Sequence, residues 1–133
     1  MKKYSIECTE EQLLLISKCV EDCCRFASGQ TELFHTSCVL EKYGEVRDEL
    51  QSIKPLVTPH LSHNASYGWN GGSCPNDAQR KFVAQTYPIY REILHFLALQ
   101  NKWNNVYDSP TLTCEEGGEL IKIKQIDNAN KNY

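Results

Sequence analysis

The sequence predicts an α+β fold for a single domain that spans residues 1–133. Apolar residues recur at helical spacing over three long stretches, whereas short stretches near both chain ends alternate apolar and polar residues as strands do. A chain of 133 residues is long enough for one substantial core but not for two. We therefore expect three main helices and a small antiparallel sheet made from the N- and C-terminal segments.

The N-terminal segment combines a strand pattern with a helix start. Residues 4–8 alternate apolar and polar side chains. Thr9 can cap the helix that follows, and Gln12, three residues later, completes a capping box. The helix ends at Gly29, where a left-handed residue is favoured. Its expected buried stripe comprises Leu13, Ile16, Val20, Cys23, Cys24 and Ala27.

A second helix is expected to begin at Thr31, which can cap it, and Gly44 is expected to bend or split it. Its expected apolar face comprises Leu33, Cys38, Tyr43, Val46, Leu50 and Ile53. Pro55 and Pro59 then close off regular structure, so residues 54–74 are expected to form one long connection. Because a long connection in a small domain is usually functional or disordered, and this one contains aromatic residues and glycines, we expect an ordered ligand-binding loop.

The third helix is expected to run from about Pro75 to Gln100, with a kink at Pro88, which removes a backbone donor. Its expected inward residues are Phe82, Ile89, Tyr90, Ile93, Phe96 and Leu97. This stripe is wider than one partner helix requires, which is typical of a central helix or of a subunit interface. We therefore expect a homo-oligomer, a dimer or larger.

The C-terminal part of the sequence predicts a hairpin. Residues 111–114 and 120–124 have strand patterns, and they flank Glu-Glu-Gly-Gly at 115–118. The N-terminal strand can pair with this hairpin to complete the small sheet. Residues 127–133 are polar, and we expect a frayed tail.

Composition and charge exclude several classes of protein. The net charge of −3 argues against sequence-independent binding to long nucleic acid. The basic residues at the N-terminus are not followed by the apolar region of a signal peptide, and no apolar run is long enough to cross a membrane. We therefore expect a cytoplasmic protein with no membrane partner, whose seven cysteines are reduced and in part act as small core residues.

Metal binding and nucleophilic catalysis receive weak support. Cys19 and Cys23, like other cysteine and histidine pairs here, have helical spacing but not the spacing of a zinc knuckle, so we expect neither metal nor cofactor. Cys74, just before a helix, is the best candidate nucleophile, because that position lowers the pKa of a thiol. His60 and His63 are a possible acid and base for phosphodiester cleavage. None of these residues belongs to a recognisable catalytic motif.

Nucleotide binding is better supported, because three segments can converge on one anionic ligand. A glycine-bearing loop that feeds a helix start supplies backbone N–H groups for an anion, and its aromatic residues supply stacking faces. Arginines grip phosphate through two parallel hydrogen bonds. The alternatives are that the loop aromatics fill the core and that the arginines pair with nearby carboxylates. The candidate ligand-binding residues are Arg25, Gln30, Ser66, Tyr67, Gly68, Trp69, Asn70, Arg80 and Arg91.

Residues 25–32, residues 64–69 and the amphipathic helix that follows them resemble a group of small phage proteins, the anti-Thoeris proteins of the first type. The resemblance covers about two-thirds of the chain in order and pattern, through short motifs. It implies a non-enzymatic, symmetric oligomer in the cytoplasm of the host cell. Such proteins bind a cyclic ADP-ribose isomer made by a bacterial TIR-domain defence enzyme and keep it from its effector, and some also bind cyclic oligonucleotides.

Sequestration of a nucleotide immune signal is therefore the function that the sequence favours. One alternative is an enzyme that cleaves such a signal. The other is an interaction protein that inhibits a host enzyme through an exposed helix face.

Overall fold

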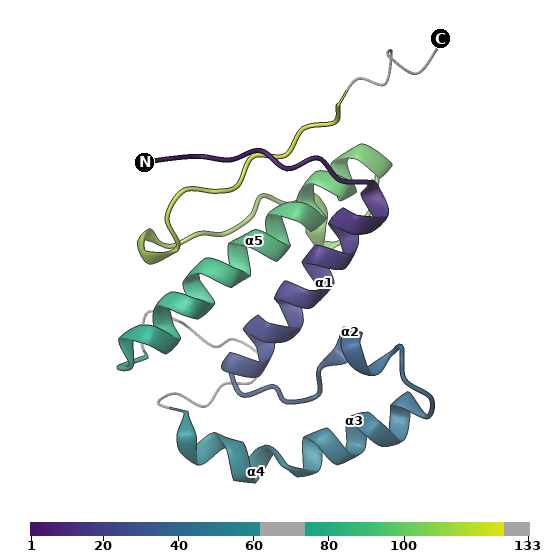
Figure 1. Cartoon of the computed structure of the whole chain (residues 1–133), viewed down its shortest axis with the longest axis vertical. Helices are drawn as coiled ribbons and strands as arrows, with labels where there is room; N and C mark the ends of the chain where they lie inside the picture. Colours follow the sequence, from purple (N-terminus) through teal and green to yellow (C-terminus); the bar gives the residue numbers. More distant parts are fainter. Residues whose placement is uncertain (62–73, 127–133) are drawn as a thin grey trace.

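The computed structural model of the chain describes residues 1–61 and 74–126, and every regular element within these ranges is helical. Two long helices, α1 (Glu10–Ala27) and α5 (Asp77–Asn101), pack side by side and form the body of the molecule (Figure 1). An arm of shorter helices lies across one end of this pair. The arm contains α2 (Phe34–Ser37), α3 (Tyr43–Ser52), α4 (Lys54–Val57) and the 3-10 turn η1 (Thr58–His60).

The predicted limits of α1 are confirmed. The Thr9 hydroxyl accepts a hydrogen bond from the Gln12 amide at 3.1 Å, and the Thr9 amide donates to the Gln12 side chain at 2.9 Å. This is the predicted capping box. Gly29 follows the helix with a φ of 97°, the left-handed conformation that glycine adopts without strain.

The buried face of α1 differs from the predicted stripe. Ile16 is 43% exposed and Cys23 is exposed, whereas Ser17 and Glu21 are buried together with Cys24. Polar side chains of α1 can face the interior because they find hydrogen-bond partners there. The Ser17 hydroxyl, for example, donates to the Tyr90 carbonyl of α5 at 3.2 Å. Periodicity alone does not reveal such a partner.

The predicted second helix is divided, and Thr31 does not cap it. Thr31 is fully buried, and its hydroxyl donates to the Leu50 carbonyl of α3 at 2.7 Å. The chain breaks between α2 and α3, at residues 38–42, before Gly44 rather than at it. Leu33 and Lys42 precede the two helices with φ values of 50° and 58°, in the left-handed region. The first part of the predicted loop 54–74 is helical, and its residues 62–73 lie outside the described ranges.

Helix α5 is close to its predicted limits and runs through Pro88 without a break. Asn76 caps it by accepting a hydrogen bond from the Gln79 amide at 3.1 Å. Its apolar stripe is wide because three elements pack on it: α1, the 3-10 turn η3 (Val106–Asp108) and the 3-10 turn η4 (Glu115–Gly117). The core cluster comprises Cys24, Val83, Tyr90 and Leu94. Among the described residues, no helix is long and apolar enough to span a bilayer.

The predicted antiparallel sheet is wrong. Neither the N-terminal segment nor residues 111–114 and 120–124 form a strand in the described structure, so the fold is helical rather than α+β. Residues 1–9 and 118–126 run as coil on the same side of α5 (Figure 1), and the Lys3 ammonium lies 3.1 Å from the Glu119 carboxylate. Tyr4 and Ile6, the apolar members of the N-terminal alternation, are 85% and 84% exposed. Their pattern therefore does not correspond to a buried face.

Contacts with α5 hold the predicted hairpin turn in another conformation. Residues 115–117 form η4, and Arg80 on α5 pairs with Glu116 at 2.9 Å. A Cβ atom on Gly117 would lie 2.3 Å from the Ala84 carbonyl oxygen, so the backbone of η4 lies directly against the helix. The turn is thus anchored to α5, and the flanking segments follow the helix instead of pairing with each other. The predicted tail, residues 127–133, lies outside the described ranges.

Candidate anion-binding site

Arg25 and Gln30 meet at the C-terminal end of α1. The Arg25 guanidinium donates from Nη1 to the Gln30 side-chain oxygen at 2.7 Å and from Nε to the Glu21 carboxylate at 2.7 Å. Arg25 therefore lies beside Gln30, as predicted, and it also forms the alternative ion pair with Glu21. Arg25 is held by several partners, which fixes its position at the end of the helix.

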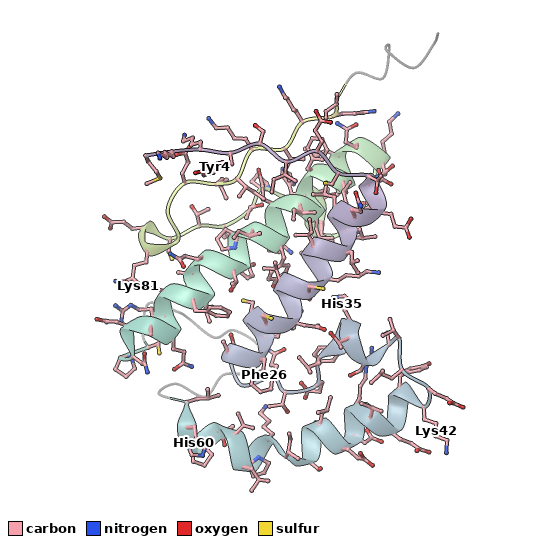
Figure 2. All side chains as sticks on the ribbon, viewed as in Figure 1. Tyr4, Phe26, His35, Lys42, His60 and Lys81 are labelled. Atoms are coloured by element: carbon pink, nitrogen blue, oxygen red, sulfur yellow. The ribbon has the colours of Figure 1, made fainter. Side chains whose placement is uncertain are left out.

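Glu21 is the central charge of this cluster. Its side chain is 8% exposed, and its second carboxylate oxygen lies 3.0 Å from Nε2 of His35. A buried carboxylate is costly unless it is paired, and here a guanidinium and an imidazole share it. Figure 2 shows His35 beside α1, at the junction of the body and the arm.

Arg91, on α5, is surrounded by aromatic rings rather than by acceptors. Its guanidinium carbon lies 4.8 Å from the ring centre of Tyr107 and 5.9 Å from that of Tyr87. Its Nε is buried and makes no hydrogen bond within the described part of the chain. The alternative that Arg91 pairs with a neighbouring glutamate is not observed there, because Glu92 accepts a hydrogen bond from Thr111 at 2.7 Å instead.

The charges of both arginines act on the Tyr107 hydroxyl. Burial raises the pKa of the Tyr107 hydroxyl, the negative charge of Glu21 raises it further, and the charges of Arg91 and Arg25 lower it. Charges on α1 and α5 thus act on one side chain of η3. The turn itself is fixed, because the Asn105 side chain accepts from the Tyr107 amide at 2.9 Å, and the Tyr107 carbonyl lies 2.8 Å from Nδ1 of His95.

Arg80 lies in a different environment and has other partners. It pairs with Asp77 at 2.6 Å and with Glu116 at 2.9 Å, and it donates to the Cys74 carbonyl at 2.8 Å. Arg80 raises the stability of the charged form of Asp77 and so lowers the pKa of that carboxyl group. Its donors clamp the start of α5 to η4, and they do not join Arg91 at the Tyr107 ring.

The remaining predicted ligand residues lie outside the described ranges: Ser66, Tyr67, Gly68, Trp69 and Asn70.

Sequence reasoning missed Tyr87 and Tyr107. The four-residue spacing of Tyr87 and Arg91 on one helix face was a usable signal. Tyr107 lies beyond the end of α5, and no local pattern connects it with Arg91.

The candidate nucleophile, Cys74, is enclosed by the start of α5. Cys74 is 2% exposed, and its thiol donates to the Asn76 carbonyl and to the Gln79 side-chain oxygen. Such a thiol is buried and satisfied rather than accessible. His60 is exposed on η1, and His63 lies outside the described residues.

The cysteines do not gather with other metal ligands in the ranges that the structure describes. No group of three or more histidine, cysteine, aspartate or glutamate side chains there has the geometry to hold a metal ion. Cys19 and Cys23 are exposed on α1, whereas Cys24 is in the core, where burial raises the pKa of its thiol.

A groove of about 270 Å³ lies elsewhere, between α5 and the C-terminal segment. Its lining includes Gln85, Pro88, Ile89, Gly117, Glu119 and Leu120, and none of the predicted ligand residues that the structure describes.

Comparisons with protein families, with curated proteins and with solved structures gave no match. The resemblance to the anti-Thoeris proteins therefore stays a prediction from the sequence. The chemistry of the site has to be argued from its own residues.

Proposed function

We propose that this protein is a non-enzymatic binding protein for a small anionic nucleotide, with Arg91 as the principal anion-binding residue. One observation carries the proposal. A partly buried guanidinium is held over two tyrosine rings and makes no hydrogen bond to the described residues. The Nε atom is enclosed by protein, so a ligand phosphate would accept hydrogen bonds from the terminal Nη groups of Arg91.

The neighbouring residues favour one anion at Arg91 rather than a general basic surface. Arg25 is neutralised by Glu21, so its charge adds little attraction of its own. Gln30 offers an amide beside it, which suits a base or a sugar hydroxyl. Tyr87 and Tyr107 keep the Arg91 side chain in place, so little side-chain entropy is lost on binding.

In its specific form, the proposal is that the protein sequesters a nucleotide immune signal, such as a cyclic ADP-ribose isomer, and so prevents activation of an anti-phage defence. The sequence resemblance supports this form, and so does a site with cationic and aromatic groups but without an accessible nucleophile among its described residues. Sequestration requires tight binding and no chemistry.

The experiment that tests this function is capture and release. The purified protein is incubated with a lysate that contains the signal, separated from it and denatured, and the released small molecules are identified by mass spectrometry. Recovery of the intact signal is expected. Recovery of a cleaved signal would replace the proposal with the enzyme alternative, and recovery of no nucleotide would contradict both.

A second candidate function is inhibition of a host protein through the outer face of α1. Leu15, Ile16 and Phe26 are 60%, 43% and 37% exposed there, and exposed Cys19 and Cys23 lie between them. A contiguous apolar face on a helix marks a protein contact. This contact can equally join copies of the chain, as the predicted homo-oligomer requires.

A further inference from the structure

Two exposed cysteines, Cys19 and Cys23, lie on the outer face of α1. Cysteine is among the residue types that are most often buried, as Cys24 of the same helix is. In the described part of the chain, neither sulfur takes part in a hydrogen bond or a disulfide. Packing of the core within one copy therefore does not account for these two thiols.

The helix holds the two thiols at a fixed spacing. Because α1 is one continuous α-helix, residues 19 and 23 lie one turn apart on the same side, with their Cβ atoms about 5–6 Å apart. A disulfide requires Cβ atoms about 3.5–4.5 Å apart, so the helix disfavours a bond between the two sulfurs. A zinc ion lies about 2.3 Å from each thiolate sulfur and can bridge this spacing. The pair is thus better suited to binding a metal ion than to oxidation.

One copy supplies half of a thiolate metal site. Zinc in structural sites takes four ligands, often four thiolates, and thiolates select soft ions. Among the residues that the structure describes, no third histidine, cysteine, aspartate or glutamate completes a group with Cys19 and Cys23. In a single copy, the described residues therefore leave the coordination of such an ion half complete. The lack of zinc-knuckle spacing applies to one chain and does not bear on a site shared by two.

The exposed stripe around the two thiols is self-complementary. If two α1 helices lie antiparallel, with position 21 of each at a two-fold axis, Cys19 of one copy faces Cys23 of the other. Ile16 then faces Phe26, and these side chains, 43% and 37% exposed in one copy, flank the four sulfurs on both sides. A two-fold contact requires such a patch, because the same surface of both copies meets itself. A second copy therefore supplies both the missing ligands and an apolar cover.

We infer that Cys19 and Cys23 form half of a four-thiolate zinc site that a second copy of this chain completes. The thiols bind as thiolates, so each zinc ion displaces their four protons, and binding weakens as the pH falls. The flanking apolar side chains exclude water from the ion. This site uses none of the residues of the proposed nucleotide site, so each of the two can fail without the other.

The test titrates the full chain with Co²⁺, a spectroscopic probe of zinc sites, without oxygen and in a reductant that contains no thiol. Wild type should bind one ion per two chains and show thiolate-to-cobalt charge-transfer absorption, which Zn²⁺ then abolishes. In light scattering, Zn²⁺ should lower the dissociation constant of the dimer about ten-fold or more, and a chelator should reverse the change.

The double variant Cys19→Ser, Cys23→Ser should lose the absorption and the zinc-dependent association. It should keep its fold, because both positions are exposed. Cys114→Ser, which removes an exposed thiol from the C-terminal segment, is the matched control and should behave as wild type does. One ion per chain, no thiolate absorption in wild type, or zinc-dependent association of the double variant would overturn the inference. Wild type decides by stoichiometry alone, whatever the variants do.

Discussion

Gly117 lies against a carbonyl group that has lost its helical partner. Pro88 has no N–H group, so the Ala84 carbonyl, four residues earlier in α5, receives no helical hydrogen bond from it. The Cα atom of Gly117 approaches this carbonyl, and a Cβ atom there would lie 2.3 Å from its oxygen. The missing N–H group of Pro88 and the missing side chain of Gly117 therefore act at the same carbonyl. Only the folded chain brings these two distant residues together.

Substitution of Gly117 should lower stability more than its exposure suggests. Gly117→Ala forces the backbone of η4 away from α5, at a cost of about 1–3 kcal/mol in the free energy of unfolding, as for other overpacked sites. Gly44→Ala is the matched control. Nothing lies within 4 Å of a Cβ atom there, so alanine should stabilise α3 by about 0.5–1 kcal/mol. Urea unfolding of both variants measures this. Equal stability of Gly117→Ala and wild type would contradict the proposed contact.

Tyr90 should make the fold sensitive to alkaline pH. Burial raises the pKa of its hydroxyl above the ordinary value of 10.0. The folded state therefore keeps a proton that the unfolded state loses, so stability is fully present below the unfolded pKa and falls as the pH rises above it. Tyr90→Phe should flatten this fall in urea unfolding between about pH 8 and pH 11. Tyr4→Phe, at an 85% exposed position, should keep the wild-type profile. Identical profiles for all three proteins would refute the role of Tyr90.

Local chemistry at single residues was predictable where both partners are close in sequence. The capping box of Thr9 and the left-handed Gly29 are of this kind. Arg91 was chosen for its charge alone, and its rings come from two separate elements. Arg80 was also chosen for its charge, but its partner Glu116 lies 36 residues away.

At the scale of elements, Asp22 attaches the arm to the body. This carboxylate is 2% exposed and accepts hydrogen bonds from the amides of His35 and Thr36, at 3.1 Å and 2.7 Å, at the start of α2. The Thr36 hydroxyl donates to it as well, at 2.7 Å. The buried stripe predicted for this helix does not include Asp22, because the partners of Asp22 lie beyond the end of its own helix.

Loss of the Asp22 charge should loosen the arm before the body. Asp22→Asn keeps the shape but loses an acceptor oxygen and the charge, which we expect to cost about 1–3 kcal/mol. Amide exchange should become faster in α2 and α3 and change little in α1 and α5. Asp48→Asn, at an exposed position of α3, is the control and should leave exchange unchanged. Uniformly faster exchange throughout the chain of Asp22→Asn would contradict a local attachment.

The strand predictions also failed because contacts with other parts of the chain decide the conformation of these segments. Alternation predicts a strand only if one side of the alternation becomes buried. In the N-terminal segment both sides stay exposed, and in the C-terminal segment the Arg80 and Glu116 ion pair and the Gly117 contact hold the turn against α5. Predictions for the two long helices were more successful because α1 and α5 bury their faces against each other.

At the scale of the whole molecule, the outer face of α1 is an exposed apolar surface in the described structure. The wide stripe of α5, from which self-association was predicted, packs within the chain against α1, η3 and η4, although Phe82 at its start is 42% exposed. The predicted oligomer therefore depends on Leu15, Ile16 and Phe26.

We expect wild type to associate at micromolar concentration and Leu15→Lys to lower its average mass in light scattering. Leu15 is 60% exposed on this face, so lysine is tolerated in the monomer but desolvated in a contact. Leu112→Lys, at a 73% exposed position of the C-terminal segment, should associate as wild type does. A monomeric wild-type protein would exclude this interface.

The measurement that tests the central claim most directly is titration of wild type and Arg91→Gln with ADP-ribose. Arg91 is expected to supply charge-assisted hydrogen bonds to a phosphate, so Arg91→Gln should lower affinity about ten- to hundred-fold with little change in thermal stability. Lys81→Gln, which removes an exposed charge from the same helix, should bind as wild type does. Equal affinities of wild type and Arg91→Gln, or no binding by wild type, would contradict the assignment of Arg91 as the anion-binding residue.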